Sequence, residues 1–409
     1  MISLSLDRYN RVFKKYFDHF LQICVWGQNL LFIMLAAYFL PIDVFGTFSF
    51  DYVIAGILGV FIKLGLDSVY IYFVNRLDFK TTIFICAAIF VSNLFLISTV
   101  LFFTKIIDVN IFILAFLIAL DEIYYSIKRV DKEAKEFLLI RNSLIFLRVI
   151  AIFFFHSNET QVILLLVISL IPSIFFYSIV IGRRYVINKN KQFTSSKIKL
   201  NSIKSISIFS FKSTISNLLG VLTVKIDILM LALLSSFTQV GYYEVGARWG
   251  FLAMIPLTLF SAINAPIITK LAKRKSYKHL LIYFNDSRKK IFYITLIYFI
   301  FLIIVRQFFS ILPNNFLYNP FDISLILAFG YTVSSFFGPT GTAIVMLGYP
   351  GSHLARITLS LLINIILNLY LIDLFGAYGA ALSTSIVLIL TALMSNKIFL
   401  NITNKYNDY

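Results

Sequence analysis

The stretch "VGYYEVGARWG" (240–250) places a carboxylate, Glu244, and a guanidinium, Arg248, in an apolar and aromatic run. They are spaced i,i+4, so on a helix they share one face and can pair. A charge at the centre of a bilayer costs about 2.5–3.5 kcal/mol on insertion scales, so such residues need a partner or water. These residue types suit binding of a charged group or exchange of a proton within a membrane.

The preceding apolar segment carries a polar stripe. At about 100° per residue, one sector of a helix contains Lys212, Ser213, Ser216, Asn217, Gly220, Thr223 and Asp227. Such a stripe faces protein or water rather than lipid, and small polar residues also mark tight helix interfaces. Lys225 falls on another side of this helix, and whether Lys225 or Asp227 faces a cavity stays open.

Asp227 is predicted to lie at the same depth in the membrane as Glu244 and Arg248. Asp227 and Arg248 each lie about 12–13 Å below the outer ends of their helices, at 1.5 Å per residue. A short loop joins the two helices, so Asp227, Glu244 and Arg248 can meet at one level. We predict a charge cluster that lines a cavity between two halves of the protein. The alternative is a fully buried triad with a purely structural role.

Two other charged positions lie deep in apolar segments. Arg148 lies about 16 Å into the segment 137–155, too deep to reach water easily. It either pairs with Asp121 or Glu122 in the preceding segment or lines the cavity as a cation. Lys63 and Asp67 are spaced i,i+4 near a helix end, and we predict that they pair there.

Gln22, Trp26 and Asn29 are spaced i, i+4, i+7 and share a helix face near the N-terminus. An aromatic ring beside amides suits contact with a sugar, and it suits packing between helices equally well. Pro256 and Pro339 lie inside apolar segments and predict kinks, with "GPTG" (338–341) as a candidate break.

The elements that position these residues are membrane spans. The chain has 409 residues, is 59% hydrophobic and 13% charged, and its mean hydropathy is +0.88. Apolar runs of 18 residues or more recur along it, and each is long enough to cross a bilayer as a helix. We therefore predict an all-α membrane protein with twelve spans, over residues 20–40, 46–66, 81–104, 108–128, 137–155, 161–182, 206–234, 239–268, 289–311, 321–347, 352–374 and 376–398.

The loops between these spans alternate in basic content. Lysines and arginines crowd the N-terminus and every second loop, whereas the other side has only Lys105 and Arg306. The positive-inside rule therefore predicts that both termini are cytoplasmic. The net charge of +17 arises from these loops. Its placement indicates that the basic residues set the membrane topology and contact anionic lipid, and it argues against nucleic-acid binding.

A polar and basic segment, 183–205, divides the chain into six spans and six spans. We predict an N-terminal lobe over 1–182, a cytoplasmic linker over 183–205 and a C-terminal lobe over 206–409. "DVFGTFSF" (43–50) and "QVGYYEVG" (239–246) open the second and eighth spans in a similar way. An even number of spans separates them, so the lobes are predicted to be related by a pseudo-two-fold axis along the membrane normal.

No constellation of residues points to catalysis or to a resident cofactor. The four histidines are scattered, and metal-ligand spacings and nucleotide fingerprints are absent from the sequence. A glycan polymerase or ligase, the membrane-enzyme alternative, would present its catalytic residues outside the membrane, where these loops are only a few residues long. We expect that the protein is not an enzyme.

Three stretches resemble the polysaccharide transport family, which belongs to the multidrug/oligosaccharidyl-lipid/polysaccharide exporter superfamily. "KIDILMLALLSSFTQVGYYEVGAR" (225–248) resembles its helix 7–8 signature, and "FGTFSF…LGLDS" (45–68) its helix 2. "LGYPGSHLARITLSLLINIILNLYLIDLFGAYGAALSTS" (347–385) resembles its helix 11–12 signature. The residues that match this pattern are Asn364, Asn368, Gly376, Gly379 and Ala380. The chain departs from the family in helix 5, where "RNSLIFLRVI" has Arg148 in place of an asparagine pattern.

The resemblance implies a flippase of the bacterial inner membrane, with its two lobes in a V around a cationic cavity. Its substrate would be an undecaprenyl-diphosphate-linked oligosaccharide, a repeat unit of O-antigen or capsule, and other polysaccharide assembly proteins would be partners. Arg148, Arg248 and one of Lys212 or Lys225 would bind the diphosphate. Asp227 and Glu244 would use an H⁺ or Na⁺ gradient. The rival is a multidrug exporter of the same superfamily, which would favour acidic cavity residues.

Overall fold

The computed structural model describes residues 27–73 except 29, 79–104, 108–130, 200–310 except 275, and 318–407, with a few residues between 164 and 170. Every regular element in these ranges is an α-helix, which confirms the all-α class. Six of these helices are long and apolar enough to cross a membrane, or seven if one bent pair counts as a single span. The number twelve stays a prediction, because spans 137–155 and 161–182 lie wholly or mostly outside the described residues.

The chain forms two compact units, residues 1–221 and 222–409. Helix α8 (Leu200–Leu234) runs from the first unit into the second. It begins inside the predicted linker 183–205, so the last part of that segment is helical rather than a loop. The division into two predicted lobes, and the relation between them, stays a prediction.

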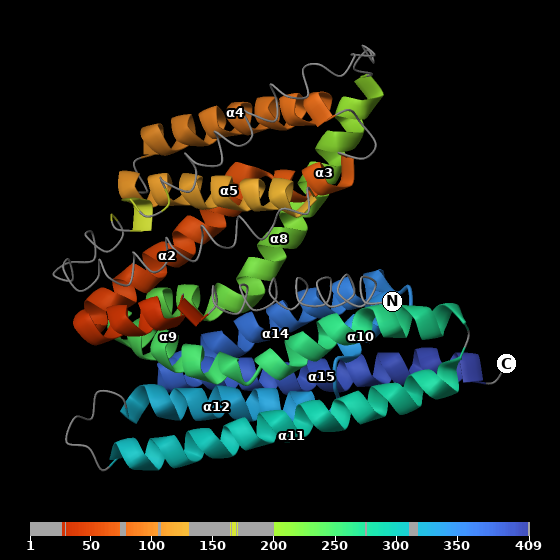
Figure 1. Cartoon of the computed structure of the whole chain (residues 1–409). Helices are drawn as coiled ribbons and strands as arrows, with labels where there is room; N and C mark the ends of the chain where they lie inside the picture. Colours follow the sequence, from red (N-terminus) through yellow and green to blue (C-terminus); the bar gives the residue numbers. More distant parts are fainter. Residues whose placement is uncertain are drawn as a thin grey trace, which may run out of the picture. The chain divides into compact units, whose positions relative to one another are not determined.

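The first unit is a small helical layer (Figure 1). Its described helices are α2 (Ile42–Lys63), α3 (Leu66–Phe73), α4 (Phe79–Thr104) and α5 (Val109–Val130), together with the start of α8 and a shorter helix over Leu30–Phe39. Both α2 and α3 pack against α5, and α4 packs against α2 and α3. These helices have long apolar stretches, which account for their packing against one another.

A break separates α2 from α3, so the prediction of one helix over 46–66 is wrong at its end. Leu64 and Gly65 both adopt positive φ angles, of 49° and 64°. A Cβ on Gly65 would lie 2.7 Å from the carbonyl oxygen of Ser210, so only glycine fits against α8 here. Asn93 of α4 donates to two carbonyls of the last turn of α2, at 2.7 and 2.9 Å. The backbone carbonyls beside the break are therefore hydrogen-bonded within the apolar layer.

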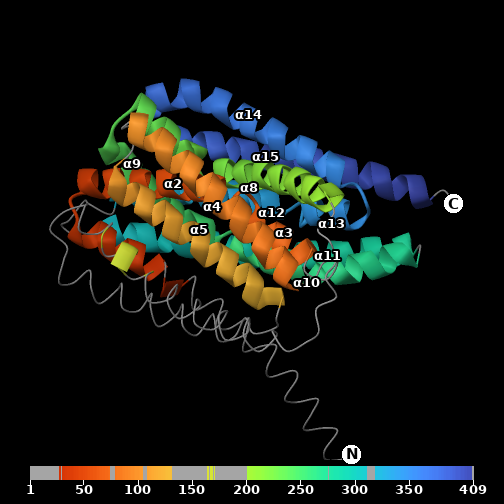
Figure 2. The same ribbon diagram turned by 90° about the horizontal axis from the view of Figure 1, so that it is seen from above.

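The second unit is a bundle of long helices (Figures 1 and 2). Beyond α8, its helices are α9 (Phe237–Leu252), α10 (Ile255–Lys273), α11 (Tyr277–Ser310), α12 (Tyr318–Ser335), α13 (Thr340–Met346), α14 (Pro350–Phe375) and α15 (Ala377–Asn407). The most extensive packing joins α9 with α12, α12 with α15 and α14 with α15. Helix α11 begins at Tyr277 rather than at residue 289, so much of the predicted basic loop is helical.

Glycine allows α9 to approach α12 closely. A Cβ on Gly246 would lie 2.6 Å from the carbonyl oxygen of Pro320, and one on Gly250 would lie 2.7 Å from Cβ of Leu327. Two small residues spaced i,i+4 are typical of tight contacts between membrane helices. This contact fixes the rotation of α9 and thereby sets where Glu244, two positions before Gly246, can point.

Two predicted spans of this unit are broken near their prolines. The span 239–268 is divided into α9 and α10, with Pro256 in the first turn of α10, where proline is tolerated. The span 321–347 is divided into α12 and α13, which are bent by 45° across a short break. Gly338 has a φ of 72° there, and Pro339 caps α13. The predicted break at "GPTG" is confirmed.

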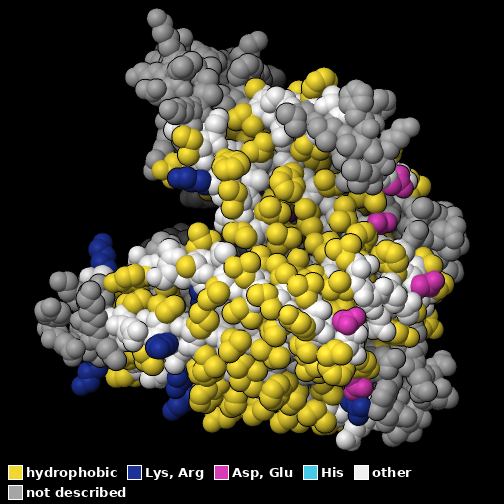
Figure 3. Space-filling model, turned by 180° about the vertical axis from the view of Figure 1, so that it is seen from behind, with side chains coloured by type: hydrophobic (Ala, Val, Ile, Leu, Met, Phe, Trp, Pro, Cys, Tyr) yellow, Lys and Arg dark blue, Asp and Glu magenta, His cyan; other side chains and the backbone are white. Residues whose placement is uncertain are grey.

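One face of the second unit shows a broad apolar surface between two polar margins (Figure 3). In the lower part of this view, most Lys and Arg side chains lie at one margin and acidic side chains lie at the other. Such a band suits a bilayer with its headgroups at both margins.

Candidate functional site

Glu244 lies between two cations inside the second unit. Its carboxylate pairs with Arg248 one turn later on α9 and with Lys225 of α8, whose Nζ lies 3.2 Å from Oε1 and 3.5 Å from Oε2. Glu244 is buried, and both cations are mostly buried. The three side chains form what we term the Glu244 cluster, which carries two positive charges and one negative charge.

Local sequence brings α8 and α9 together. Helix α8 ends at Leu234, and Ser236 caps α9 because its hydroxyl accepts from the backbone N–H of Gln239. The connection is so short that the two helices run back along each other. Lys225, in the last third of α8, thereby reaches Glu244, at the middle of α9.

Asp227 has a different environment, which we term the Asp227 cage. It is only 2% exposed. Its Oδ2 accepts from the Tyr243 hydroxyl at 2.5 Å and the Thr384 hydroxyl at 2.6 Å, and its Oδ1 accepts from Asn368 Nδ2 at 2.7 Å. Helices α8, α9, α14 and α15 each contribute one of these four residues.

Further hydrogen bonds orient the groups that donate to Asp227. Asn368 Nδ2 also donates to Asn364 Oδ1 at 2.8 Å, so both of its protons are used. Asn364 Nδ2 donates in turn to the Thr384 hydroxyl at 3.3 Å, which leaves the hydroxyl proton for Asp227. The cage therefore presents neutral donors to a carboxylate that acts only as an acceptor, the arrangement that an ionised carboxylate requires.

The predicted triad of Asp227, Glu244 and Arg248 is therefore divided in two. Glu244 and Arg248 pair as their i,i+4 spacing predicted. Asp227 bonds to neutral groups instead, and Lys225 is the third member of the Glu244 cluster. Lys225 and Asp227 lie on different sides of α8 but both reach α9, because Glu244 and Tyr243 are adjacent there and each binds one of them.

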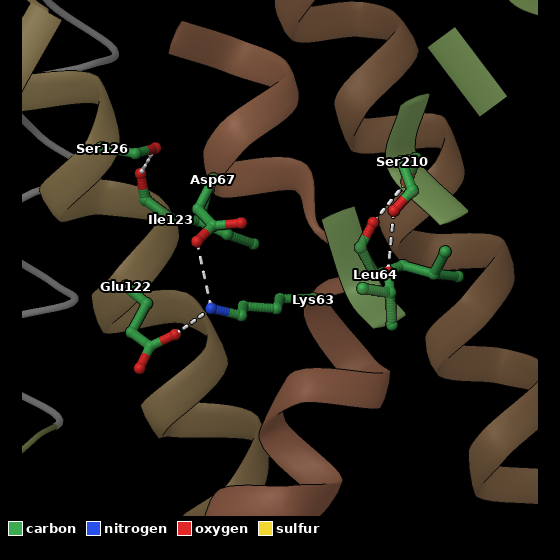
Figure 4. A network of polar contacts seen from close by, with 8 residues as sticks. Lys63, Leu64, Asp67, Glu122, Ile123, Ser126 and Ser210 are labelled. Carbon is green, nitrogen blue, oxygen red and sulfur yellow. Dashed lines mark hydrogen bonds and ion pairs between the residues drawn. The ribbon is translucent and has the colours of Figure 1, made fainter. Parts of the chain in front are cut away.

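A second charge cluster lies in the first unit, at the end of α2 (Figure 4). Lys63 donates to Asp67 at 3.1 Å, as predicted, and also pairs with Glu122 of α5. Ser210 of α8 donates to the carbonyl of Leu64 in the adjoining break. These bonds, which we term the Lys63 cluster, fasten the α2–α3 break to two other helices. Glu122, one of the two predicted partners of Arg148, bonds to Lys63.

The remaining predicted site residues are placed as follows. Lys212 is an exposed residue of α8 in the first unit and makes no ion pair with any described residue. Arg148, Gln22, Trp26 and Asn29 lie outside the described residues, so their assignments stay predictions.

Sequence reasoning missed all three partners of Asp227, namely Tyr243, Asn368 and Thr384. A signal for Asn368 was present, because Asn364 and Asn368 are spaced i,i+4 and lie on one face of α14. Across the part of the chain that the structure describes, no group of three or more His, Cys, Asp or Glu residues is arranged to hold a metal ion. Any cation held by Asp227 would therefore rely on neutral oxygen ligands.

Comparison with known proteins identifies the fold. No protein-family model matches the chain, and no curated protein matches it. Among solved structures, it is similar to the inward-facing conformation of a multidrug resistance MATE family transporter of the MOP superfamily. The TM-score is 0.67 at 14% identity, over 93% of this chain and 95% of that one.

The chain is similar as well to the lipid II flippase MurJ in its inward closed conformation. Here the TM-score is 0.62 at 16% identity, over 95% of this chain and 90% of that one. An outward-facing MATE transporter gives a TM-score of 0.58 at 13% identity, with 95% of both chains covered. The chain thus has the fold that MATE transporters and MurJ share, over nearly its whole length. The narrower resemblance to the polysaccharide transport family stays a prediction.

Proposed function

We propose that the protein is a flippase that moves an undecaprenyl-diphosphate-linked oligosaccharide, a repeat unit of O-antigen or capsule, across the bacterial inner membrane. It would work by alternating access and use an ion gradient. The fold supports this proposal, because one protein that shares it is a lipid II flippase. The family resemblance of residues 225–248 and 347–385 supports the glycan class.

The observation that carries the proposal is the Glu244 cluster. Its two cations outnumber its one carboxylate, so a net positive charge is held among apolar helices. Arg248 Nε is buried and makes no hydrogen bond within the described structure. A diphosphate offers the acceptors and the negative charge that such a cluster lacks, and guanidinium suits phosphate geometry. Glu244 would hold both cations until the substrate arrives.

The Asp227 cage suits the coupling ion. The carboxylate of Asp227 is buried and hydrogen-bonds only to neutral groups, and a proton or Na⁺ would neutralise its charge. Because the cage joins α8, α9, α14 and α15, a change in its bonding would alter the packing of four helices at once. This is the form of coupling that alternating access needs.

A second candidate is export of cationic drugs. It is favoured by the likeness to the inward-facing multidrug MATE transporter, at a TM-score of 0.67. A cationic substrate would need an acidic residue that is free to receive it. Glu244 is already neutralised by two cations, and Asp227 is only 2% exposed behind its hydrogen bonds, so these two carboxylates favour an anionic substrate instead.

Complementation tests the proposal directly. The gene is expressed in a bacterial strain whose own repeat-unit flippase has been deleted, and surface polysaccharide is measured. We expect the wild-type chain to restore it and Arg248→Gln to reduce it at least about tenfold, equivalent to about 1.4 kcal/mol of lost substrate binding. Arg306→Gln, which removes an arginine elsewhere in the second unit, is the matched control and should restore it. Drug efflux without polysaccharide would favour the second candidate, and full activity of Arg248→Gln would reject the cluster as the binding site.

Coupling is tested separately at the cage. Asp227→Asn keeps the shape of the side chain but removes its charge, so we expect inserted protein whose transport no longer responds to an H⁺ or Na⁺ gradient. Transport into inverted vesicles is measured with each gradient imposed and then collapsed by an ionophore. Transport by the wild-type chain that is unchanged after both gradients are collapsed would refute ion coupling.

A further inference from the structure

Arg356 differs from four other buried or partly exposed cations of the described helices. Lys63, Lys225, Arg248 and Arg306 each pair with a carboxylate. Arg356 on α14 pairs with none among the described residues. Its Nη2 donates to His353 Nδ1 at 2.9 Å, and its Nε is buried without a hydrogen-bond partner in this part of the chain.

The neighbour of this guanidinium defines the chemistry of the site. Arginine is always a donor, so His353 Nδ1 must accept, and the imidazole is then neutral with its proton on Nε2. The pair therefore offers only donors to a ligand: Nε and the other guanidinium N–H groups of Arg356, and Nε2–H of His353. A charge that is removed from water without a counter-ion is costly, so this arrangement calls for an anion.

The backbone leaves room beside the pair. Gly341, just after the break between α12 and α13, lies against it. A Cβ at Gly341 would come within 3.1 Å of Arg356 Nη2 and 3.2 Å of His353 Cε1. A side chain at this position would therefore press on the guanidinium.

The site lies at the basic end of the second unit. Helix α13 packs against α10, whose last turn carries Lys270 and Lys273. Arg356 is six residues after the start of α14, which is about 9 Å along the helix. This is the depth of lipid headgroups at a membrane face that is rich in lysine and arginine. Asn364 of the Asp227 cage lies about 12 Å further along α14, so the two sites are separate.

We propose that Arg356 and His353 bind the phosphate group of a lipid that enters from the membrane face carrying the basic residues. A phosphate diester supplies the missing negative charge and accepts from several N–H groups at once. The bound lipid would also hold α14 against the α12–α13 break, where these two helices are bent by 45° relative to each other. This site does not depend on what the protein transports.

Native mass spectrometry of the purified full-length chain tests the site. The ligands are phosphatidylglycerol and, as a phosphate-free control, diacylglycerol with the same acyl chains. We expect the wild-type chain to prefer phosphatidylglycerol at least about tenfold and Arg356→Gln to lose that preference. Gly341→Ala should weaken it several-fold without any change of charge, whereas Lys273→Gln, a matched loss of charge at the same end, should not. If excess inorganic phosphate alone displaces the lipid, the occupant is free phosphate. That result would still support a phosphate site at Arg356 and His353.

A folding control accompanies these variants. Because Arg356 has no carboxylate partner among the described residues, Arg356→Gln should unfold at the same temperature as the wild-type chain, or higher, when lipid is removed. An Arg356→Gln protein that keeps the wild-type preference, or a wild-type chain that shows none, overturns the proposal.

Discussion

The Lys63 cluster and the Glu244 cluster are built from the same kinds of residue with opposite charge balance. In the first unit, one buried lysine is held by two carboxylates, and Glu122 is 46% exposed. In the second unit, one buried carboxylate holds two cations, of which Lys225 is 18% and Arg248 is 23% exposed. Water can therefore compensate the excess charge of the first cluster more easily than that of the second.

This difference indicates different roles. The Lys63 cluster adjoins a break in the backbone and fastens α2 and α3 to α5, so it stabilises a local geometry. The Glu244 cluster joins α8 to α9 and keeps a net positive charge in an apolar setting. A surplus of charge that the fold itself does not need is best explained by a ligand of opposite sign.

Removing the central carboxylate should have the largest effect. Glu244→Gln leaves Lys225 and Arg248 without a counter-ion while they stay mostly buried, so we expect the free energy of unfolding to fall by about 3–5 kcal/mol. Titration with denaturing detergent measures it. The matched control is Glu122→Gln, which leaves Lys63 paired with Asp67 and should cost clearly less. Equal losses in the two variants would contradict the contrast between the clusters.

Removing the central lysine should have an intermediate effect. Lys63→Met leaves Asp67 and Glu122 without their cation, but Glu122 is nearly half exposed and can be hydrated. We expect a loss of about 1–3 kcal/mol, together with faster proteolysis at the α2–α3 break. Limited proteolysis of the purified chain measures the second quantity. Unchanged cleavage there would show that the cluster does not hold the break.

The smallest effect is expected at a pair outside both clusters. Arg306 and Asp322 join α11 to α12 and are both partly exposed. Arg306→Gln should therefore change stability by no more than about 1 kcal/mol, as measured by the midpoint of thermal unfolding. A loss as large as that of Glu244→Gln would show that burial does not control the strength of these pairs.

The contacts that the sequence predicted are local ones. The Lys63–Asp67 and Glu244–Arg248 pairs follow from the i,i+4 spacing, and the break at 338–341 follows from glycine and proline. The bounds of α14 and the start of α15 agree with the prediction to within two residues, because both ends are marked by glycine or proline. Helical geometry alone determines such features.

The sequence did not predict the partners of Asp227. Its bonds to Asn368 and Thr384 join residues 141 and 157 positions apart, and nothing in local periodicity reports such distances. The end of α2 was missed for a related reason. The run through residues 64–66 is apolar throughout, and the turn there depends on contact with Ser210 of α8.

The amino-acid sequence by itself determined that this protein is an α-helical membrane protein with an excess of positive charge, because length, hydropathy and charge placement act locally along each helix. Tertiary structure alone decided which charges are compensated. It placed Lys225 beside Glu244, surrounded Asp227 with neutral donors and left Arg356 without a carboxylate among the described residues. Compensation depends on which helices pack side by side, and that choice is made by long-range contacts such as the close approach of α9 and α12.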